Sequence, residues 1–333
     1  MKKLIIVSAF ALAAISTRAQ VNDKIGAEPD EIKAMAKKTL VVELPEENAK
    51  VIASFSKKTA EADLAAYRAS LASYREQIEP AVRKYWSYNK NIEFKKTSEV
   101  VALFQKKSTK YVALMKVVLA DGGGAYVYSF GLGVPAIVLT RTDGDSKVTK
   151  KGQLELRKYD YQMYLVTNPS DDGTESYSEA GMKFTLTQAQ KHMDWIVKST
   201  KSKTYHDYCK AMAKSNCSKL ASKDLMVDEA GLYKSVDKSE AVESYGKAID
   251  FEPAADLQKA YLDATPGKAV LISLPIGTIS GTLVVVTITK LVYMKVVVDT
   301  ETNTVLNAIV PGMGKTYVEG VTKMDLRQLA DCN

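Results

Sequence analysis

A pattern of strand, helix, strand, glycine-bearing loop and β-ribbon occurs twice in this chain, and this repetition constrains the fold more than any other feature. In the first copy we predict a strand at residues 92–96, a helix at 98–107 and a strand at 111–119. In the second copy we predict a strand, two helices and a strand at residues 232–236, 239–249, 254–262 and 269–274. Alternating strands and helices favour α/β units, so the two copies are candidates for a duplication.

Before the first copy, apolar side chains recur at spacings of three and four residues. The series is Leu64, Tyr67, Leu71, Tyr74, Ile78, Ala81 and Tyr85. This spacing puts them on one stripe of a helix, which we expect to pack against other parts of the fold. A helical segment ending near Lys57 precedes the stripe, so the two predict a helical hairpin. We expect a kink near Pro80, because proline lacks the amide hydrogen that a helix interior uses.

These patterns predict a mixed α/β (α+β) fold in which an N-terminal helical hairpin precedes two duplicated strand–helix–strand units with β-ribbons. The 333 residues are enough for about two domains. We predict a signal peptide at residues 1–19, a helical region at 20–90, a first α/β unit at 91–167, a polar boundary with a lysine-rich helical region at 168–230 and a second α/β unit at 231–333. The boundary follows from the polar, Pro- and Gly-containing segment 168–177.

Local turn and capping signals refine this outline. The Asp143-Gly144 pair predicts a β-hairpin between residues 136–140 and 154–166, and residues 299–303 predict a second one. Residues 187–190 match a capping box that would open a helix, and residues 322–325 match another that would open the last helix. The apolar run at 283–298 is rich in Val and Ile and contains two lysines, so it predicts two buried strands and not a membrane span.

The first twenty residues carry a targeting signal. Lys2 and Lys3 precede an apolar run that is too short to span a bilayer, and Thr17 and Ala19 place small side chains where a signal peptidase reads them. We therefore predict a signal peptide that is cleaved after Ala19. Because no cysteine lies near this junction to carry a lipid, we expect a periplasmic or secreted protein.

Removal of the signal peptide would change the charge of the protein. The full chain has 46 basic and 39 acidic residues and a net charge of +7. Without residues 1–19 there would be 43 basic and 39 acidic residues, a net charge of +4. This surplus gives weak support to a polyanionic partner, and the predicted export disfavours nucleic acid as that partner.

One region concentrates positive charge beside aromatic residues. Residues 191–223 contain eight lysines and two aspartates, a net charge of +6. We predict from this pattern a binding face formed by Lys198, Lys201, Lys203 and Lys210 with Trp195, Tyr205 and Tyr208. Such a face could bind an anionic envelope polymer or an acidic protein. The alternative is a solvated helical face whose aromatic side chains belong to the core.

The same region holds the chain's two histidines and two of its three cysteines. His206 and Cys209 would share one side of a helix, and with Cys217 they form a candidate zinc site, to which His192 could be brought in space. The alternative is surface histidine with a disulfide or free thiols. On one continuous helix Cys209 and Cys217 would lie about 12 Å apart. This is beyond disulfide reach, so their pairing would need a break in the helix.

No motif identifies a reaction or a cofactor. Residues 311–316 resemble the end of a phosphate-binding loop, but Ile309 stands where the motif needs its first glycine, so we interpret the segment as a turn. We find no serine-hydrolase, zinc-protease or β-lactamase motif in a suitable context, and we expect no cofactor. The leading hypothesis is an exported non-enzymatic protein that binds a protein partner or a cell-envelope component. The alternatives are a secreted hydrolase whose site forms only in the fold, and an envelope scaffold with an exposed apolar strip along Leu64, Leu71 and Ile78.

Overall fold

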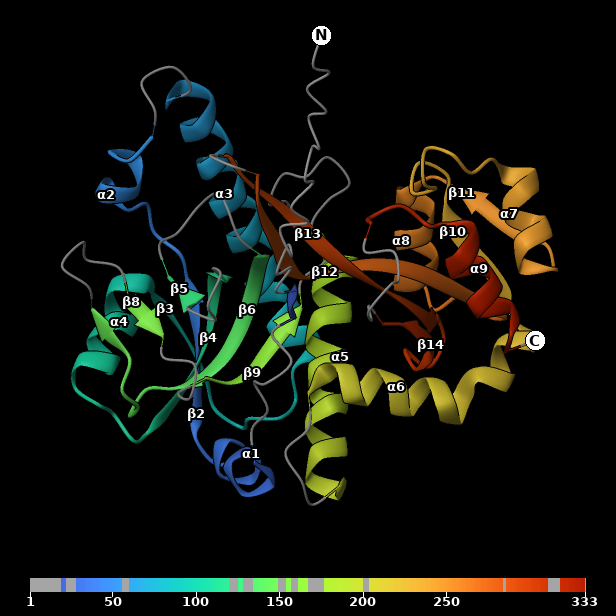
Figure 1. The fold of residues 1–333 in the computed structure, drawn as a ribbon. Coiled ribbons are helices and arrows are strands. Elements are labelled where there is room, and N and C mark those ends of the chain that lie inside the picture. Colours follow the sequence, from blue (N-terminus) through green and yellow to red (C-terminus); the bar gives the residue numbers. More distant parts are fainter. Residues whose placement is uncertain are drawn as a thin grey trace, which may run out of the picture.

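The chain folds into two mixed sheets with helices packed around them (Figure 1). The computed structural model describes residues 19–21, 28–55, 60–119, 125–127, 134–148, 154–156, 161–166, 177–199, 204–283, 286–310 and 318–332. Parallel and antiparallel strands occur together in each sheet, which confirms the predicted α+β or mixed α/β fold class. The predicted signal peptide and the segment 168–176 lie outside the described residues, apart from Ala19.

The first sheet is built from the N-terminal half of the chain. Its elements are α1 (Pro29–Met35), β2 (Thr39–Leu44), α2 (Ala49–Ile52), α3 (Ala60–Tyr85), β3 (Ile92–Lys96), α4 (Thr97–Gln105), β4 (Tyr111–Leu119), β5 (Ala125–Tyr126), β6 (Val134–Arg141), β7 (Lys147–Val148), β8 (Leu154–Leu156) and β9 (Tyr161–Val166). The main strand order is β3-β2-β4-β6-β9, with β2, β3 and β4 parallel and the last two strands antiparallel. Because β2 pairs with both β3 and β4, the strands of this sheet begin before residue 91, the predicted start of the first unit.

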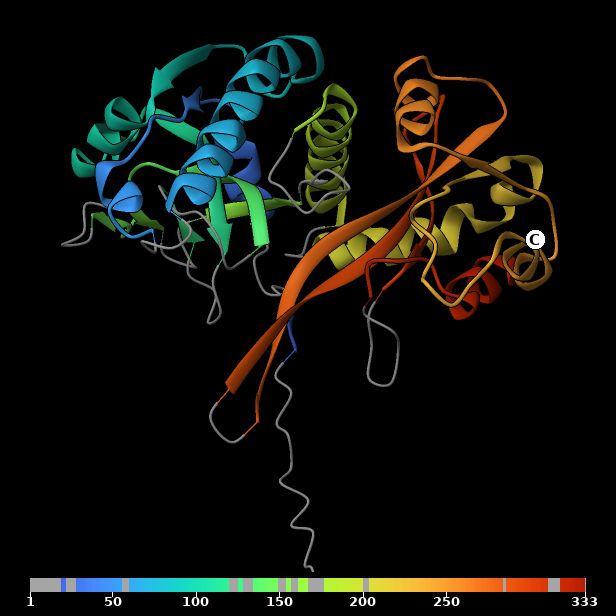
Figure 2. The same ribbon diagram turned by 90° about the horizontal axis from the view of Figure 1, so that it is seen from above.

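The second sheet is built from the C-terminal half. Its elements are α5 (Glu179–Ser199), α6 (Tyr205–Asn216), the 3-10 helix η1 (Cys217–Ser222), β10 (Asp224–Asp228), α7 (Lys238–Tyr245), β11 (Ile249–Glu252), α8 (Ala254–Leu262), β12 (Lys268–Leu283), β13 (Val286–Asp299), β14 (Val305–Ile309) and α9 (Lys323–Ala330). The strand order is β11-β10-β12-β13-β14, and β1 (Ala19–Val21) pairs with β12. Strands β12 and β13 form a long ribbon that extends well beyond the rest of this sheet (Figure 2).

The two sheets share one topology. In each, the first strand lies between the second and third strands, all three are parallel, and two antiparallel strands follow. The pairing register also matches, with Leu40–Ile92 and Thr39–Tyr111 in the first sheet and Leu225–Ile249 and Asp224–Lys268 in the second. This agreement in order and register supports the predicted duplication.

The structure corrects the strand that opens the second copy. The counterpart of β3 is β11, and residues 232–236 do not form a strand. Within that segment Leu232 makes an isolated parallel bridge with Val321. The first strand of the second unit is instead β10, so this unit starts at residue 224.

Two predicted β-features also differ in the structure. The predicted antiparallel pairing of residues 136–140 with 154–166 is confirmed, because β6 pairs with β9. The connection is not a tight hairpin, because the Asp143-Gly144 turn leads into β7, which pairs with β8. The run 283–298 is mostly the single strand β13 rather than two strands. The second predicted hairpin is confirmed, because residues 300–304 connect the antiparallel strands β13 and β14.

Helix α5 begins earlier than its capping pattern predicts. The box at residues 187–190 lies inside the helix, where the Thr187 hydroxyl donates to the carbonyl of Lys183 at 2.5 Å. Helix formation starts at Glu179 because Ala180 and Phe184 are buried in the core. The other predicted box is confirmed, since Thr322 and Asp325 cap α9 reciprocally.

The apolar stripe of α3 is buried, as its spacing predicts. Tyr67, Leu71, Tyr74, Ile78 and Ala81 are each at most 4% exposed. The helix runs through Pro80 without a break and contacts β2 and α5. The exposed apolar strip that a scaffold protein would need along this helix is therefore not present at Leu71 and Ile78.

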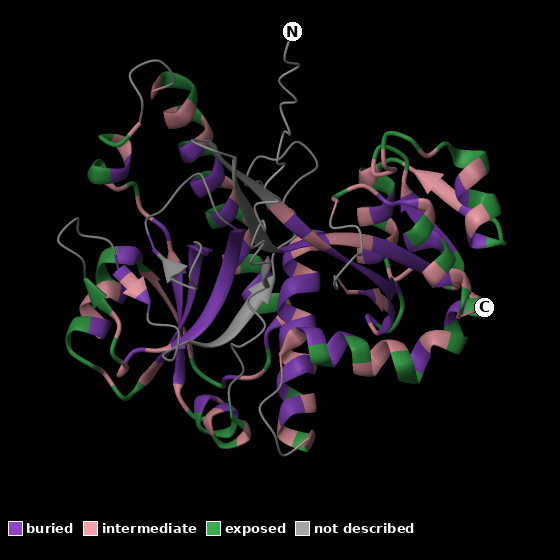
Figure 3. Cartoon of the chain, in the orientation of Figure 1, coloured by how far each residue is buried: buried purple, intermediate pink, exposed green. Residues whose placement is uncertain are grey.

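One hydrophobic core joins the two units. Val41 and Val138 of the first sheet belong to the same buried cluster as Val270 and Val296 of the second. Figure 3 shows buried residues along the central strands of both sheets and along α5, which stands between them. The ribbon adds to this contact, because β12 approaches β6 and β9.

A buried polar network also connects α5 with the turn between β13 and β14. Asn303 occupies a left-handed conformation at φ 53° and is 7% exposed. The Gln188 amide donates to the Asn303 carbonyl at 2.8 Å, and the Tyr261 hydroxyl donates to the Asn303 Oδ1 at 2.5 Å. The Lys191 ammonium donates to the carbonyl of Thr302 at 2.7 Å. These contacts fix α5 on the turn between β13 and β14.

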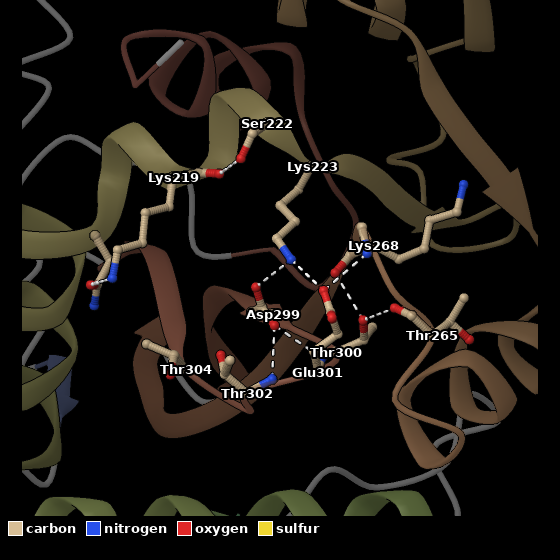
Figure 4. A network of polar contacts seen from close by, with 12 residues as sticks. Lys219, Ser222, Lys223, Thr265, Lys268, Asp299, Thr300, Glu301, Thr302 and Thr304 are labelled. Atoms are coloured by element: carbon tan, nitrogen blue, oxygen red, sulfur yellow. Dashed lines mark hydrogen bonds and ion pairs between the residues drawn. The ribbon is translucent and has the colours of Figure 1, made fainter.

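Side-chain contacts also fix the other side of the turn between β13 and β14 (Figure 4). The Lys223 ammonium lies 2.8 Å from a carboxylate oxygen of Asp299 and 2.7 Å from one of Glu301. The Thr300 hydroxyl donates to the carbonyl of Thr265 at 2.5 Å and to that of Lys268 at 2.9 Å. Lys191 and Lys223, two of the eight lysines of the charged region, therefore contribute to internal contacts.

Candidate functional site

A cavity of about 400 Å³ lies between α5 and the second sheet. Its wall is formed by the start of α5, the end of β10 with the loop that follows, α8, β12, β13 and residues 319–321. The cavity thus includes residues that are more than a hundred positions apart in the sequence.

The sheet topology explains why a cavity forms here. Strand β10 ends at Asp228, and α8 begins at Ala254 after the neighbouring parallel strand β11. Open α/β sheets bind their ligands outside the carboxyl ends of parallel strands, because loops diverge there and leave a crevice. The cavity occupies this position in the second unit.

Two loop segments close one side of the cavity. The Tyr233 amide donates to the carbonyl of Val321 at 3.0 Å, and the Val321 amide donates to the carbonyl of Gly231 at 2.8 Å. A methyl group on Gly320 would lie 2.7 Å from the Cα of Tyr233. Only glycine therefore permits this close backbone approach.

The inner wall of the cavity is apolar. Phe184, Leu257, Tyr261 and Val270 line it and belong to the shared core, where each is at most 8% exposed. The Tyr261 hydroxyl bonds to Asn303 and its ring forms part of the wall. A ligand in the cavity would therefore meet a rigid surface, because these side chains are fixed by core packing.

The outer wall carries polar groups. Asp228, Gln258, Ser273 and Tyr293 are half-buried, and Glu319 is exposed. An Asp228 carboxylate oxygen accepts a hydrogen bond from the Ala230 amide at 3.1 Å, and the Ser273 hydroxyl donates to the Glu319 carbonyl at 2.8 Å. Burial and the nearby Glu319 carboxylate raise the pKa of Tyr293 to about 12. Its hydroxyl therefore stays protonated at neutral pH and can donate a hydrogen bond.

The first unit has a carboxylate at the equivalent position, but there the site is closed. By the matched registers, Glu43 at the end of β2 corresponds to Asp228 at the end of β10. Glu43 accepts hydrogen bonds from the Thr97 hydroxyl at 2.6 Å and from the Lys116 amide at 2.9 Å. Tyr67 and other side chains leave a hollow of only about 10 Å³ beside it. Burial raises the pKa of Glu43 to about 7, although these two hydrogen bonds lower it.

The predicted lysine-rich binding residues are only partly described. Lys198 lies near the end of α5 and Lys210 lies on α6, and both are exposed. Lys201 and Lys203 lie outside the described residues.

The aromatic residues of that region pack together. The ring centroids of Trp195 and Tyr208 lie 5.8 Å apart, and those of Tyr205 and Tyr208 lie 5.7 Å apart. Tyr208 is 2% exposed, and the other two rings pack against the same core cluster. Their position matches the alternative interpretation, in which these aromatic side chains belong to the core.

The candidate zinc residues do not come together as a set. Cys217 forms a disulfide with Cys332, with their Cα atoms 5.1 Å apart, which takes its thiol away from a metal. His206 and Cys209 are both buried, and burial raises the pKa of the Cys209 thiol to about 12. Across the described part of the chain, no group of three His, Cys, Asp or Glu side chains is arranged to hold a metal ion.

Sequence reasoning did not identify the cavity residues. The duplication is the signal that points to them. When the two units are aligned by strand register, Asp228 takes the position that is equivalent to Glu43. The sequence alone favours residues 232–236 as the counterpart of residues 92–96, and that alignment does not match Asp228 with Glu43.

Comparison with known proteins gives no relative for this chain. No family model, no curated protein and no solved structure matches it. Among the described residues, no helix combines the length and the apolar character that crossing a membrane requires.

Proposed function

We propose that this protein is an exported, non-enzymatic binding protein that holds a small molecule, or the end of a cell-envelope component, in the cavity between α5 and the second sheet. The observation that carries the proposal is the cavity itself, which lies at the carboxyl end of β10 between α5 and α8. Its volume of about 400 Å³ falls within the range of small-molecule sites.

The composition of the wall supports binding. Apolar residues such as Phe184 and Leu257 can cover the body of a ligand, while Asp228, Gln258 and Tyr293 can orient it through hydrogen bonds. Such a combination of a large apolar surface with a few polar groups is typical of ligand pockets.

A secreted hydrolase is the second candidate, because the carboxyl groups of Asp228 and Glu319 both line the cavity. Paired carboxyl groups can act as general acid and base. We favour binding because Asp228 already accepts a hydrogen bond within its own turn, and because Glu319 is exposed to solvent.

Two neighbouring positions on α8 allow a matched test. Ala254 lines the cavity, whereas Ala255 is exposed and does not line it. The variant Ala254→Phe should fill the cavity, and Ala255→Phe should place the same side chain in solvent.

The protein and both variants would be incubated with a low-molecular-weight extract of the cell envelope and examined by native mass spectrometry. We expect one bound compound in the wild type and in Ala255→Phe, and none in Ala254→Phe. Equal retention by all three proteins, or retention by none, would contradict the proposal. Release of the compound in cleaved form would favour the hydrolase.

A further inference from the structure

The cavity wall also indicates what kind of ligand fits. We infer that the cavity binds a neutral saccharide of about one or two sugar rings, an inference that rests on the proposed function. A saccharide combines apolar C–H faces with a dense set of hydroxyl groups. The cavity offers a partner for each of these features.

Two aromatic side chains can pack on the apolar face of a sugar ring. Tyr233, in the loop after β10, and Tyr293, on β13, both line the cavity and are half-buried, so part of each ring stays accessible. Tyr261 and Phe184 are instead fixed in the core and shape the floor. Tyrosine provides a rigid apolar surface with a polar tip, which suits a ligand that has both characters.

The polar groups of the wall match hydroxyl groups. The carboxylates of Asp228 and Glu319 are hydrogen-bond acceptors, the Gln258 amide both donates and accepts, and the hydroxyls of Ser273 and Tyr293 do the same. Ser273 already donates to the Glu319 carbonyl and Tyr293 is hydrogen-bonded to the Glu319 side chain. A hydroxyl-rich ligand would therefore use the Gln258 amide, the remaining carboxylate lone pairs and the acceptor lone pairs of the two hydroxyls. These groups lie in the outer part of the cavity and leave the apolar floor to the ring.

Other ligand classes fit less well. An anionic ligand would meet two carboxylates, Asp228 and Glu319, against one ammonium, that of Lys234, among the described lining residues. An acyl chain would desolvate those carboxylates without offering them a hydrogen bond, which is costly. A cationic ligand would gain from the two carboxylates, of which Lys234 offsets one, but it would leave the hydroxyl and amide groups of the wall without matching partners. A neutral polyhydroxylated ring has none of these conflicts.

The test uses the full mature protein and a defined panel of probes. The panel contains neutral hexoses, N-acetylhexosamines and their disaccharides, together with an aromatic amine and a medium-chain fatty acid. Binding would be measured by saturation-transfer NMR and by titration calorimetry. The variants are Tyr293→Ala, Tyr293→Phe and Glu319→Gln. Glu243→Gln, at an exposed position of α7, is the control for loss of a carboxylate outside the cavity.

We expect at least one neutral saccharide to bind the wild type and Glu243→Gln equally. Its affinity should fall at least tenfold in Tyr293→Ala, less than threefold in Tyr293→Phe and several-fold in Glu319→Gln. Binding of the amine or the fatty acid alone, lost in Ala254→Phe, would overturn the saccharide inference and leave the proposed function standing. No binding by any probe, together with no compound retained from the envelope extract, would overturn both.

Discussion

The buried carboxyl group of Glu43 should make the stability of this protein depend on pH in an unusual direction. Glu43 is 1% exposed, and burial raises its pKa from 4.5 to about 7 in the folded state. An acid whose pKa is higher in the folded state stabilises the fold when it is protonated. The contribution of Glu43 to the free energy of unfolding is therefore fully present below pH 4.5 and is lost as the pH rises through about 7.

The magnitude follows from the difference between the two pKa values. Each unit of difference corresponds to about 1.4 kcal/mol, so this group should lower the free energy of unfolding by on the order of 3 kcal/mol between pH 4.5 and pH 7. The variant Glu43→Gln keeps a similar shape but cannot ionise. It should remove this pH dependence, at a pH-independent cost of about 1 kcal/mol for one altered hydrogen bond.

Urea unfolding of the wild type and Glu43→Gln at a series of pH values from 4.5 to 8 would measure this effect. The stability of the variant relative to the wild type should increase by roughly 3 kcal/mol across the series. Glu61→Gln removes an exposed carboxyl group from α3 and should keep the wild-type profile. A constant difference between the wild type and Glu43→Gln at all pH values would refute the reasoning.

Three further variants test other parts of the structure. Asn303→Gly should lower the free energy of unfolding by about 3 kcal/mol, because the variant loses the buried hydrogen bonds of the amide side chain. Asn303→Ala should lower it by about 1 kcal/mol more, because alanine disfavours the φ of 53° at this position. Equal losses for the two variants in denaturant unfolding would contradict this. Cys332→Ser should lower the free energy of unfolding by about 4 kcal/mol, because the disulfide between Cys217 and Cys332 links residues 115 positions apart. A reductant should lower the stability of the wild type to the same level and leave that of the variant unchanged. Charge reversal at Lys198, Lys201, Lys203 and Lys210 should weaken association with anionic envelope polymers at low salt, and unchanged, salt-insensitive association would exclude a lysine face.

Local patterns predicted those elements whose signals are confined to short segments. The spacing from Leu64 to Tyr85 predicted the buried face of α3, and the box at residues 322–325 predicted the start of α9. The same kind of box at residues 187–190 failed, because burial of Ala180 and Phe184 extends α5 toward its N-terminus. Tertiary contact overrides a capping signal when the preceding turn has a core to pack against.

The candidate site could not be predicted in the same way. Phe184, Asp228, Tyr293 and Glu319 meet in the cavity only because α5, β10, β13 and the segment before α9 converge. None of these residues belongs to a short motif, so their spacing along the chain carries no signal. The lysine-rich region could be recognised because its lysines are close together in the sequence. Its aromatic residues, however, pack in or against the hydrophobic core.

Methyl-detected NMR on the mature protein would test the cavity as a ligand site most directly. The sample would be titrated with the envelope extract, or with any saccharide that binds, and the methyl signals of Leu, Val and Ile would be followed. We predict shift changes concentrated on Leu257, Val270 and Ile272 in the cavity wall, with none in Ala254→Phe and the full set in Ala255→Phe. Changes that centre on α6, or that persist in Ala254→Phe, would contradict the account.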